Sequence, residues 1–197
     1  MPTENSMTKE PPPIGIGKES ASPVRTELSV KSSAITDDVR TQHAVAQFLY
    51  RQSELLDAKL WQHYIDLFAD DGHYWMPAMP EQTTGEGVPS IFYEDKNLMR
   101  VRMKRVLHPD AWSQRPLWGT SHVVSNVVVE SIDAESGDVT VRSRFHMLEL
   151  RRDNTRHFAG SYLHHLTQIA DGYLIRLQRV DMVNAQAPYD YVLQVWV

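Results

Sequence analysis

The sequence predicts an α+β fold, in which one strongly curved, mostly antiparallel sheet wraps around helices that come before it in the chain. Two observations lead to this prediction. Apolar residues recur at helical spacing between Val45 and Phe68, whereas from Ser121 onward apolar and polar residues alternate, as they do in strands. Short polar connections separate the alternating runs, which predicts consecutive antiparallel hairpins. Helices followed by a meander of strands is the element order of an α+β domain.

The first 35 residues are predicted to form an extended or flexible arm. They carry Pro11, Pro12, Pro13 and Pro23 among scattered Ser, Thr and Gly and show no hydrophobic period. Such a composition cannot form a packed core. The remaining residues, 36–197, are enough for one domain with a real core but hardly for two. The sequence therefore predicts a single domain preceded by an arm.

Three helices are expected in the first part of this domain. The first begins at Thr36, a good N-cap that is followed by two aspartates in the first turn, and it runs to Asp57. A second, short helix should stop in the turn-forming sequence ADDG at residues 69–72. The third helix is predicted over residues 93–108.

The strands are predicted from period-two alternation and from the position of proline. The sequence HYWMPAMP, residues 73–80, is expected to be a short edge strand or an extended segment, because proline cannot donate to a central ladder. Residues 81–90 should form a loop. Four long strands are expected after the third helix, followed by a final strand: they cover residues 121–131, 138–150, 157–170, 172–185 and 189–197.

Composition excludes several classes of function. The chain has 20 Lys and Arg against 25 Asp and Glu, a formal net charge of −5, and an acidic domain is a poor match to nucleic acid. Cysteine is absent, which removes disulfides, thiolate nucleophiles and cysteine-ligated metal sites. No apolar run approaches the roughly 20 residues of a membrane span, and the start of the chain lacks the pattern of a secretion signal. A cytoplasmic protein with no membrane partner is expected.

Nine histidines raise the question of a metal site. His164 and His165 are adjacent on a predicted strand, so they point to opposite faces and cannot bind one ion together. An iron site with two histidines and one carboxylate could still be assembled from His157 or His165 with Asp181. No ligand spacing favours it, and surface or hydrogen-bonded core histidines are the preferred interpretation. No metal ligand is therefore predicted in this chain.

A curved sheet closed by helices makes a conical cavity, and an Asp and a His inside such a cavity could transfer protons. The candidates for this dyad are Asp71, His73, His122, His165 and Tyr162. The alternative is that bulky side chains fill the cone, and this interpretation is preferred because such residues are abundant. The predicted fillers are Trp61, Phe68, Trp75 and Phe145.

Four blocks of sequence together resemble a known family. They are QFLYRQSELLDAKLWQHYIDLFADDGHYWMPAMPE (47–81), YEDKNLMRVRMKRV (93–106), PLWGTSHVVSNVVVE (116–130) and the terminal YVLQVWV. In this order they resemble the small, or beta, subunit of aromatic-ring-hydroxylating dioxygenases, which are Rieske non-haem iron enzymes. The resemblance covers residues 40–197, and YWMP is more similar to the benzoate-like branch than to the biphenyl-like branch.

The resemblance implies a cone-shaped domain over residues 36–197, similar to nuclear transport factor 2 and the cystatin-like folds, ketosteroid isomerase and scytalone dehydratase. It implies a scaffold role in a hexamer of three small and three large subunits. The large subunit would hold a Rieske [2Fe-2S] cluster and a mononuclear Fe(II), receive electrons from NADH through a ferredoxin or reductase, and make cis-dihydrodiols. The absence of cysteine agrees, because a Rieske centre needs two thiolates. No cofactor and no active site are then expected in this chain.

A permanent subunit interface is large and enriched in aromatic, Met and Arg side chains. Three segments fit this description: residues 74–79, the third helix and the last predicted strand. The proposed contacts are Tyr74, Trp75, Met76, Met79, Arg100, Arg105, Tyr189, Tyr191 and Trp196. For Trp75 and Trp196, a place in the chain's own core is at least as good an interpretation. The alternative function is a free-standing cone-fold dehydratase or isomerase with an Asp/His dyad.

Overall fold

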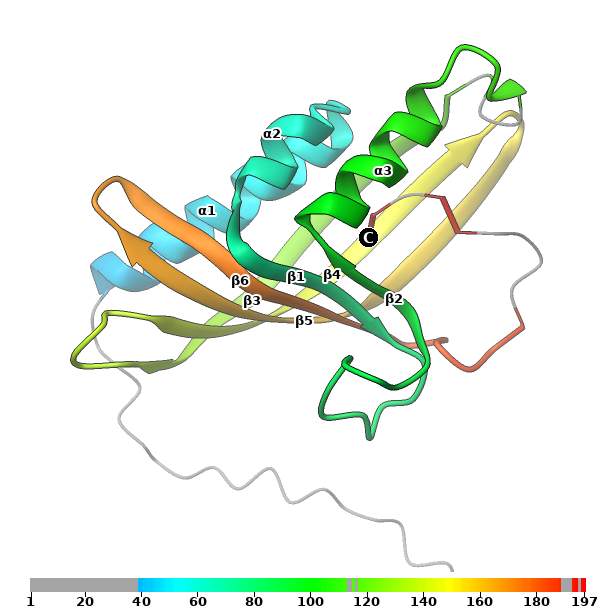
Figure 1. The fold of residues 1–197 in the computed structure, drawn as a ribbon. Coiled ribbons are helices and arrows are strands. Elements are labelled where there is room, and N and C mark those ends of the chain that lie inside the picture. The colour runs from blue at the N-terminus through cyan, green and yellow to red at the C-terminus, as the bar shows by residue number, and fades with distance from the viewer. Residues whose placement is uncertain (1–38, 113–114, 116, 189–192, 195) are drawn as a thin grey trace, which may run out of the picture. The chain divides into compact units, whose positions relative to one another are not determined.

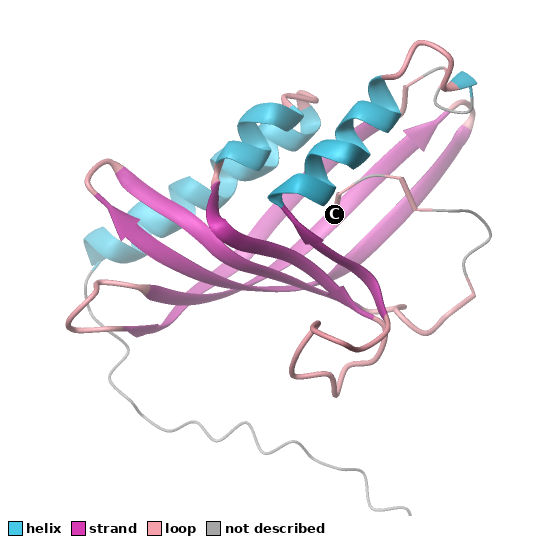
Figure 2. Cartoon of the chain, in the orientation of Figure 1, coloured by secondary structure: helices cyan, strands magenta, loops and turns pink. Residues whose placement is uncertain are grey.

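The computed structural model describes residues 39–112, 115, 117–188, 193–194 and 196–197 (Figure 1). The predicted arm and the predicted N-cap at Thr36 lie outside this part of the chain. Within it, the predicted α+β class is confirmed: helices lie along one side of a curved, unclosed sheet of six strands (Figure 2). None of the helices in the described ranges has the length and apolar character needed to cross a membrane.

The three helices are α1 (Val39–Asp57), α2 (Trp61–Asp66) and α3 (Lys96–Leu107). The apolar stripe predicted for the first helix is confirmed. The residues of α1 that are buried lie on one face: Val45, Leu49, Gln52, Leu55 and Leu56. One member of this buried stripe, Gln52, is polar, and its partners lie on the sheet.

The start of the third helix differs from the prediction, because residues 93–95 belong to a strand. Asp95 ends that strand with an extended backbone, and its carboxylate accepts a hydrogen bond of 2.8 Å from the backbone amide of Leu98. This contact satisfies one of the free amides in the first turn of α3. Asp95 therefore sets the beginning of the helix.

The sheet has the strand order β2-β1-β6-β5-β4-β3. The strands are β1 (Phe68–Pro77), β2 (Ser90–Asp95), β3 (Gly119–Ile132), β4 (Val139–Arg151), β5 (Asn154–Ile169) and β6 (Gly172–Met182). The predicted meander is confirmed, since β3 to β6 pair with their chain neighbours in antiparallel fashion. The sheet is mixed at one place only among the described strands, where β1 runs parallel to β6.

Strand β1 corrects two predictions. Residues 69–72 lie inside β1 and do not form a turn after α2, and β1 lies between β2 and β6 instead of at an edge. A Cβ atom on Gly72 would overlap the carbonyl oxygen of Ile175 on β6, so this glycine allows the two backbones to approach. Pro77 is tolerated because it is the last residue of β1, beyond a register shift after Met76.

The final strand predicted over residues 189–197 lies largely outside the described residues. Of the described ones, Leu193, Gln194, Trp196 and Val197 are not in a strand. Trp196 and Val197 are buried: the indole of Trp196 donates to Glu94 Oε2 at 3.2 Å, and the Val197 amide donates to the hydroxyl of Tyr74 at 3.3 Å. The end of the chain therefore contributes to the core.

The core lies between the helices and the concave face of the sheet. Three of the four predicted fillers, Trp61, Phe68 and Phe145, belong to this core. Trp75 is buried as well, but on the other face of β1 against Ser90 and Arg179, so it does not fill the cone. The ring of Phe145 stacks on that of Tyr162, with centroids 4.3 Å apart and an angle of 17° between the planes. Aromatic rings therefore occupy the interior at the middle of the sheet.

Helix α1 is attached to β3 at an irregular point of the strand. The register of β3 with β4 shifts between Ser125 and Val128, and Asn126 has a positive φ of 51°. The side chain of Gln42 on α1 donates to the carbonyl of Val127 at 2.6 Å and accepts from the amide of Val129 at 3.3 Å. The SNV sequence thus forms a bulge whose backbone groups are free to bind the helix.

Candidate functional site

The residues of the segment 74–79 have different environments. Tyr74 and Met76 are buried in the apolar core. Trp75 is buried on the other face of β1, where its indole donates to Ser90 Oγ at 3.0 Å and lies under the guanidinium of Arg179. Met79 is 50% exposed. The core covers one face of β1 at this point, and Gly85, Ser90 and Arg179 lie against Trp75 on the other. The expectation that YWMP presents apolar surface is therefore wrong for its first three residues, and replacing Met76 with Asp would disturb the fold itself.

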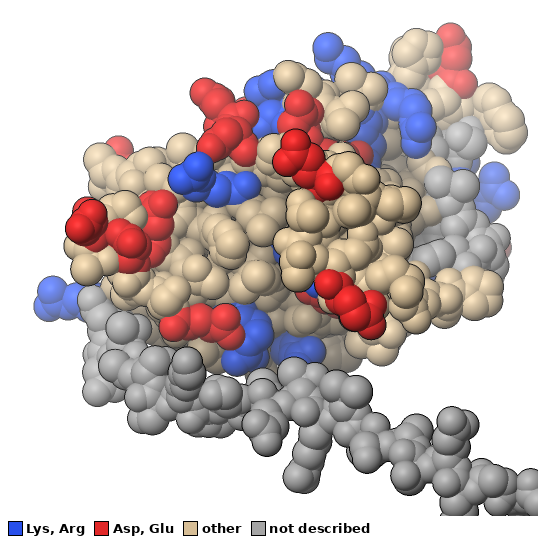
Figure 3. All heavy atoms as spheres, turned by 60° about the horizontal axis from the view of Figure 1, so that its bottom comes forward, with Lys and Arg blue, Asp and Glu red and all other residues tan. Residues whose placement is uncertain are grey.

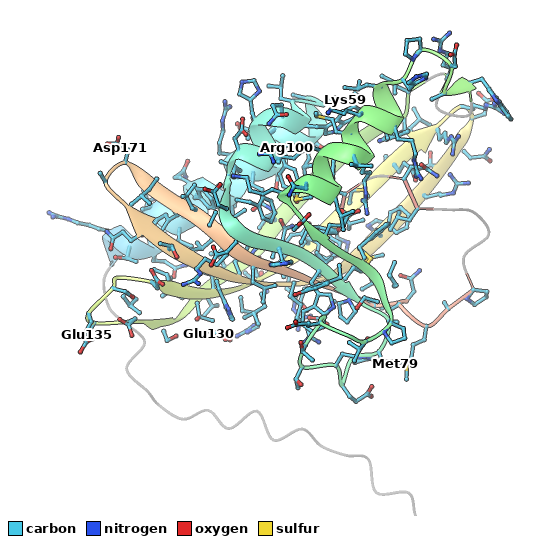
Figure 4. All side chains as sticks on the ribbon, in the orientation of Figure 1. Lys59, Met79, Arg100, Glu130, Glu135 and Asp171 are labelled. Atoms are coloured by element: carbon cyan, nitrogen blue, oxygen red, sulfur yellow. The ribbon has the colours of Figure 1, made fainter. Side chains whose placement is uncertain are left out.

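The other proposed contacts are distributed over the molecule. Arg100 is half-buried and Arg105 exposed on α3, Trp196 is buried, and Tyr189 and Tyr191 lie outside the described residues. Figure 4 shows Met79 in the loop after β1, well separated from Arg100 on α3. The structure thus brings α3 close to the end of the chain, whereas Met79 lies away from α3.

A buried ion pair joins α3, β2 and the end of the chain. The guanidinium of Arg102 lies 2.8 Å from the carboxylate of Glu94, with side-chain exposures of 7% and 12%. The same guanidinium lies 3.6 Å from the ring centroid of Phe92 and 5.1 Å from that of Trp196. Burial raises the pKa of Glu94, although Arg102 and the indole of Trp196 act in the opposite direction. Nothing in the local sequence marks Glu94 as buried, so this pair was not predicted.

Beside this ion pair lies a groove between α3 and the edge strand β2, with a volume of about 330 Å³. We call it the α3–β2 groove. It is lined by Ile91, Phe92, Tyr93, Glu94, Leu98, Val101, Arg102 and Arg105. Leu98 and Val101 on its helical side are 51% and 61% exposed. Its chemistry suits an apolar segment that also carries a carboxylate, since an exposed arginine stands at the rim.

The predicted dyad residues Asp71 and His165 line a second, larger groove of about 640 Å³, at the outer face of the sheet. Asp71 is paired with Arg176 at 2.8 Å, and both side chains are exposed. Burial, and then the charge of Arg176, lower the pKa of His165. His73 contacts the backbone oxygen of Asp71 and stacks on the ring of Tyr93, 4.9 Å away. These residues are therefore not assembled inside the cone.

An Asp/His pair does exist, but between other partners. His122 Nδ1 lies 2.6 Å from Asp57 Oδ1, and the backbone amide of His122 donates to Asp57 Oδ2 at 2.8 Å. Burial alone would raise the pKa of Asp57, but its hydrogen bonds to His122, the charge of that histidine and a bond from Thr120 together lower it. The pair connects the end of α1 to β3. His122 was among the predicted dyad residues and Asp57 was not, although both belong to the blocks that carry the family resemblance.

The iron site considered from the sequence is not brought together. The carboxylate of Asp181 is held by Arg179 at 2.7 Å, and His157 Nε2 lies 2.9 Å from His146 Nδ1. In the part of the chain that the structure describes, no three His, Cys, Asp or Glu side chains are grouped as metal ligands would be. On the face shown in Figure 3, basic side chains are scattered among acidic ones and form no continuous basic stripe.

The sequence of this chain matches that of a known family over most of its length. A family profile described as "Ring hydroxylating beta subunit" matches residues 51–188. The chain belongs to the ring-hydroxylating beta-subunit family. This beta subunit is 32% identical to the small subunit of anthranilate 1,2-dioxygenase from Acinetobacter baylyi over 146 residues, which are 72% of this chain and 88% of the relative.

Solved structures agree with the fold of the beta subunit. The beta subunit of benzoate 1,2-dioxygenase from Burkholderia mallei superposes with a TM-score of 0.62 at 27% identity, covering 76% of this chain and 95% of that one. A scytalone dehydratase homologue from Novosphingobium aromaticivorans superposes with a TM-score of 0.57 at 14% identity, covering 79% and 91%. The second likeness concerns the fold alone, and it confirms the predicted cone class. As a small subunit of a ring-hydroxylating dioxygenase, the chain has a large subunit as its partner.

Proposed function

We propose that this beta subunit is the non-catalytic scaffold of an aromatic-ring-hydroxylating dioxygenase, in a cytoplasmic hexamer of three small and three large subunits. The observation that supports this best is the interior, where aromatic rings occupy the middle of the cone and the Asp57–His122 pair is used to attach α1 to β3. A scaffold needs a rigid fold and an outer surface that binds its partner, and it needs no cavity.

The oxidative chemistry is assigned to the large subunit. A Rieske cluster is held by two cysteines and two histidines, and this chain has no cysteine, so its residues do not fit the cluster. The Rieske [2Fe-2S] cluster and the mononuclear Fe(II) are therefore proposed for the large subunit, with electrons from NADH arriving through a ferredoxin or reductase. The relatives that act on anthranilate and benzoate favour an aromatic carboxylate as substrate and a cis-dihydrodiol as product.

The α3–β2 groove is proposed as the docking site of the large subunit. Strand β2 is at the edge of the sheet, and its sequence SIFYED has neither the lysine nor the proline that commonly protect free edges. Two apolar residues of α3 are more than half exposed beside it. Arg100 and Arg105 add positive charge, so the occupant we propose is a large-subunit segment with apolar and acidic side chains.

Copies of the beta subunit are proposed to meet elsewhere on the surface. Met79, half exposed in the loop after β1, and Tyr189, Tyr191 and Trp196 near the end of the chain stay proposals for the interfaces of the hexamer. Trp196 would act indirectly, because it is buried and holds Glu94. Tyr74, Trp75 and Met76 would act in the same indirect way, by fixing β1.

Coexpression with the large subunit tests the docking proposal. The double variant Leu98→Asp/Val101→Asp places two charges on the groove, and it should remain folded by circular dichroism but fail to copurify with the large subunit. The matched control is Val183→Asp, a residue that is 81% exposed beyond the end of β6. If the groove variant assembled like wild type, the α3–β2 groove would not be the docking site.

The alternative function, a free-standing dehydratase or isomerase, keeps one observation in its favour, which is the open groove that Asp71 and His165 share. Assays of the purified chain separate the two functions. We expect no stoichiometric iron by elemental analysis and no turnover of aromatic substrates by the chain alone. Turnover that is lost in both Asp71→Asn and His165→Gln would establish the alternative.

A further inference from the structure

Four polar side chains share the concave face of the sheet, next to the stacked rings of Phe145 and Tyr162. We call them the concave polar cluster: Gln52 on α1, Ser143 on β4, His164 on β5 and Gln178 on β6. All four are buried, with exposures of 4% or less. His164 is directly opposite Gln178 in the ladder, and Ser143 is opposite Tyr162, two residues from His164.

The hydrogen bonds of this cluster are incomplete. Gln178 Oε1 accepts from Gln52 Nε2 at 2.6 Å and from the hydroxyl of Tyr64 at 2.9 Å. Five buried atoms have no hydrogen-bond partner among the described residues: Gln52 Oε1, Gln178 Nε2, Ser143 Oγ, His164 Nδ1 and His164 Nε2. Buried polar atoms are rarely left unpaired, because each one loses its bond to water without a replacement. Five such atoms on neighbouring strands and the helix that faces them therefore indicate that something else binds them.

The unpaired atoms define the chemistry of that ligand. Gln52 Oε1 accepts a hydrogen bond and Gln178 Nε2 donates one, while a neutral imidazole and a hydroxyl can each do both. Burial, and then the charge of His165, lower the pKa of His164 to about 3, so the imidazole is neutral. The cluster contains no carboxylate, lysine or arginine. It has one imidazole, that of His164. It therefore suits neither an anion nor a metal ion.

We propose that the concave polar cluster binds ordered internal water. Water is small, uncharged and both a donor and an acceptor, and a buried water molecule makes about three hydrogen bonds to otherwise unpaired groups. With five unpaired atoms, the cluster accommodates about two such molecules. This water links α1 to β4, β5 and β6. Among the side chains of the cluster, Gln52 and Gln178 share a direct hydrogen bond. The proposal is independent of the role in the dioxygenase.

The sign of a stability change tests this assignment. Ser143→Ala removes the hydroxyl with little change of volume. If water occupies the cluster, the variant loses a satisfied hydrogen bond, and its melting temperature should fall by about 2 to 4 °C. If Ser143 Oγ is truly unpaired, its removal should raise the melting temperature, and the proposal fails. Ser161→Ala, on the outer face of β5, is the matched control and should melt within about 1 °C of wild type.

A direct observation completes the test. A crystal structure of the full chain, alone or with the large subunit, should contain ordered water within hydrogen-bond distance of His164 and Ser143, and NMR should detect long-lived water next to the His164 ring. Absence of both signals would overturn the proposal. A neutral organic molecule could make the same hydrogen bonds as water. Mass spectrometry of the denatured protein would detect such a molecule if it copurified, and its presence would overturn the assignment to water.

Discussion

Replacing Phe145 with alanine should destabilise the subunit strongly, because the ring is part of the filling of the cone. The side chain is 0% exposed and stacks on Tyr162 with centroids 4.3 Å apart. Truncating a buried phenylalanine to alanine costs about 3 to 5 kcal/mol, and a well-stacked aromatic pair accounts for about 0.5 to 1.5 kcal/mol of such a loss. The free energy of unfolding of such a domain is roughly 5 to 15 kcal/mol in total, so about a fifth of it or more depends on this ring.

Guanidinium denaturation followed by circular dichroism measures the effect. With a slope of about 4 kcal/mol per molar denaturant, the midpoint should fall by about 1 M. Leu148→Ala is the control on the same strand, since Leu148 is 44% exposed on the opposite face. This variant should change the free energy of unfolding by no more than about 0.5 kcal/mol. A loss below about 1.5 kcal/mol for Phe145→Ala, with an unchanged slope, would refute the packed interior.

Three further predictions concern titratable and charged side chains. Arg102→Met should cost on the order of 3 to 5 kcal/mol in the same assay, since it leaves the Glu94 carboxylate buried without its partner, and a loss under about 1 kcal/mol would contradict this. Asp57→Asn should cost about 1 kcal/mol at neutral pH, because Asp57 is partly exposed; its lowered pKa means that the difference from wild type should shrink as the pH falls below about 4. The wild type should lose stability relative to His164→Leu as the pH falls from about 6.5 toward 3, because only the unfolded chain takes up a proton on this histidine in that range; parallel pH curves would rule this out.

Local patterns were sufficient to predict the meander. Strands β3 to β6 have long alternating runs and short polar turns, and both signals come from residues that are close in the chain. Strand β1 could not be predicted in this way. Its place between β2 and β6 depends on pairing with residues about a hundred positions later, and Gly72, which resembles a turn residue, serves as a close contact with Ile175.

The candidate site was predicted only in part, because composition does not distinguish an interface from a core. Trp75 and Trp196 belong to segments that are rich in aromatic residues, and the structure buries both within the chain. The Glu94–Arg102 pair depends on the contact of β2 with α3 and has no signature in the sequence. The Asp57–His122 pair had a signature in the sequence, since the two residues stand in separate blocks of the family resemblance.

The parallel contact of β1 with β6 also constrains how the chain can be made. During synthesis, α1, α2, β1, β2 and α3 leave the ribosome long before β6, the only strand among the described ones that joins β1 to the meander. At about 5 to 20 residues per second, β1 waits on the order of ten seconds with one edge unpaired. The aromatic residues of β1 are exposed during that interval, so truncation before Gly172 should leave a nascent chain that chaperones bind and that aggregates when released.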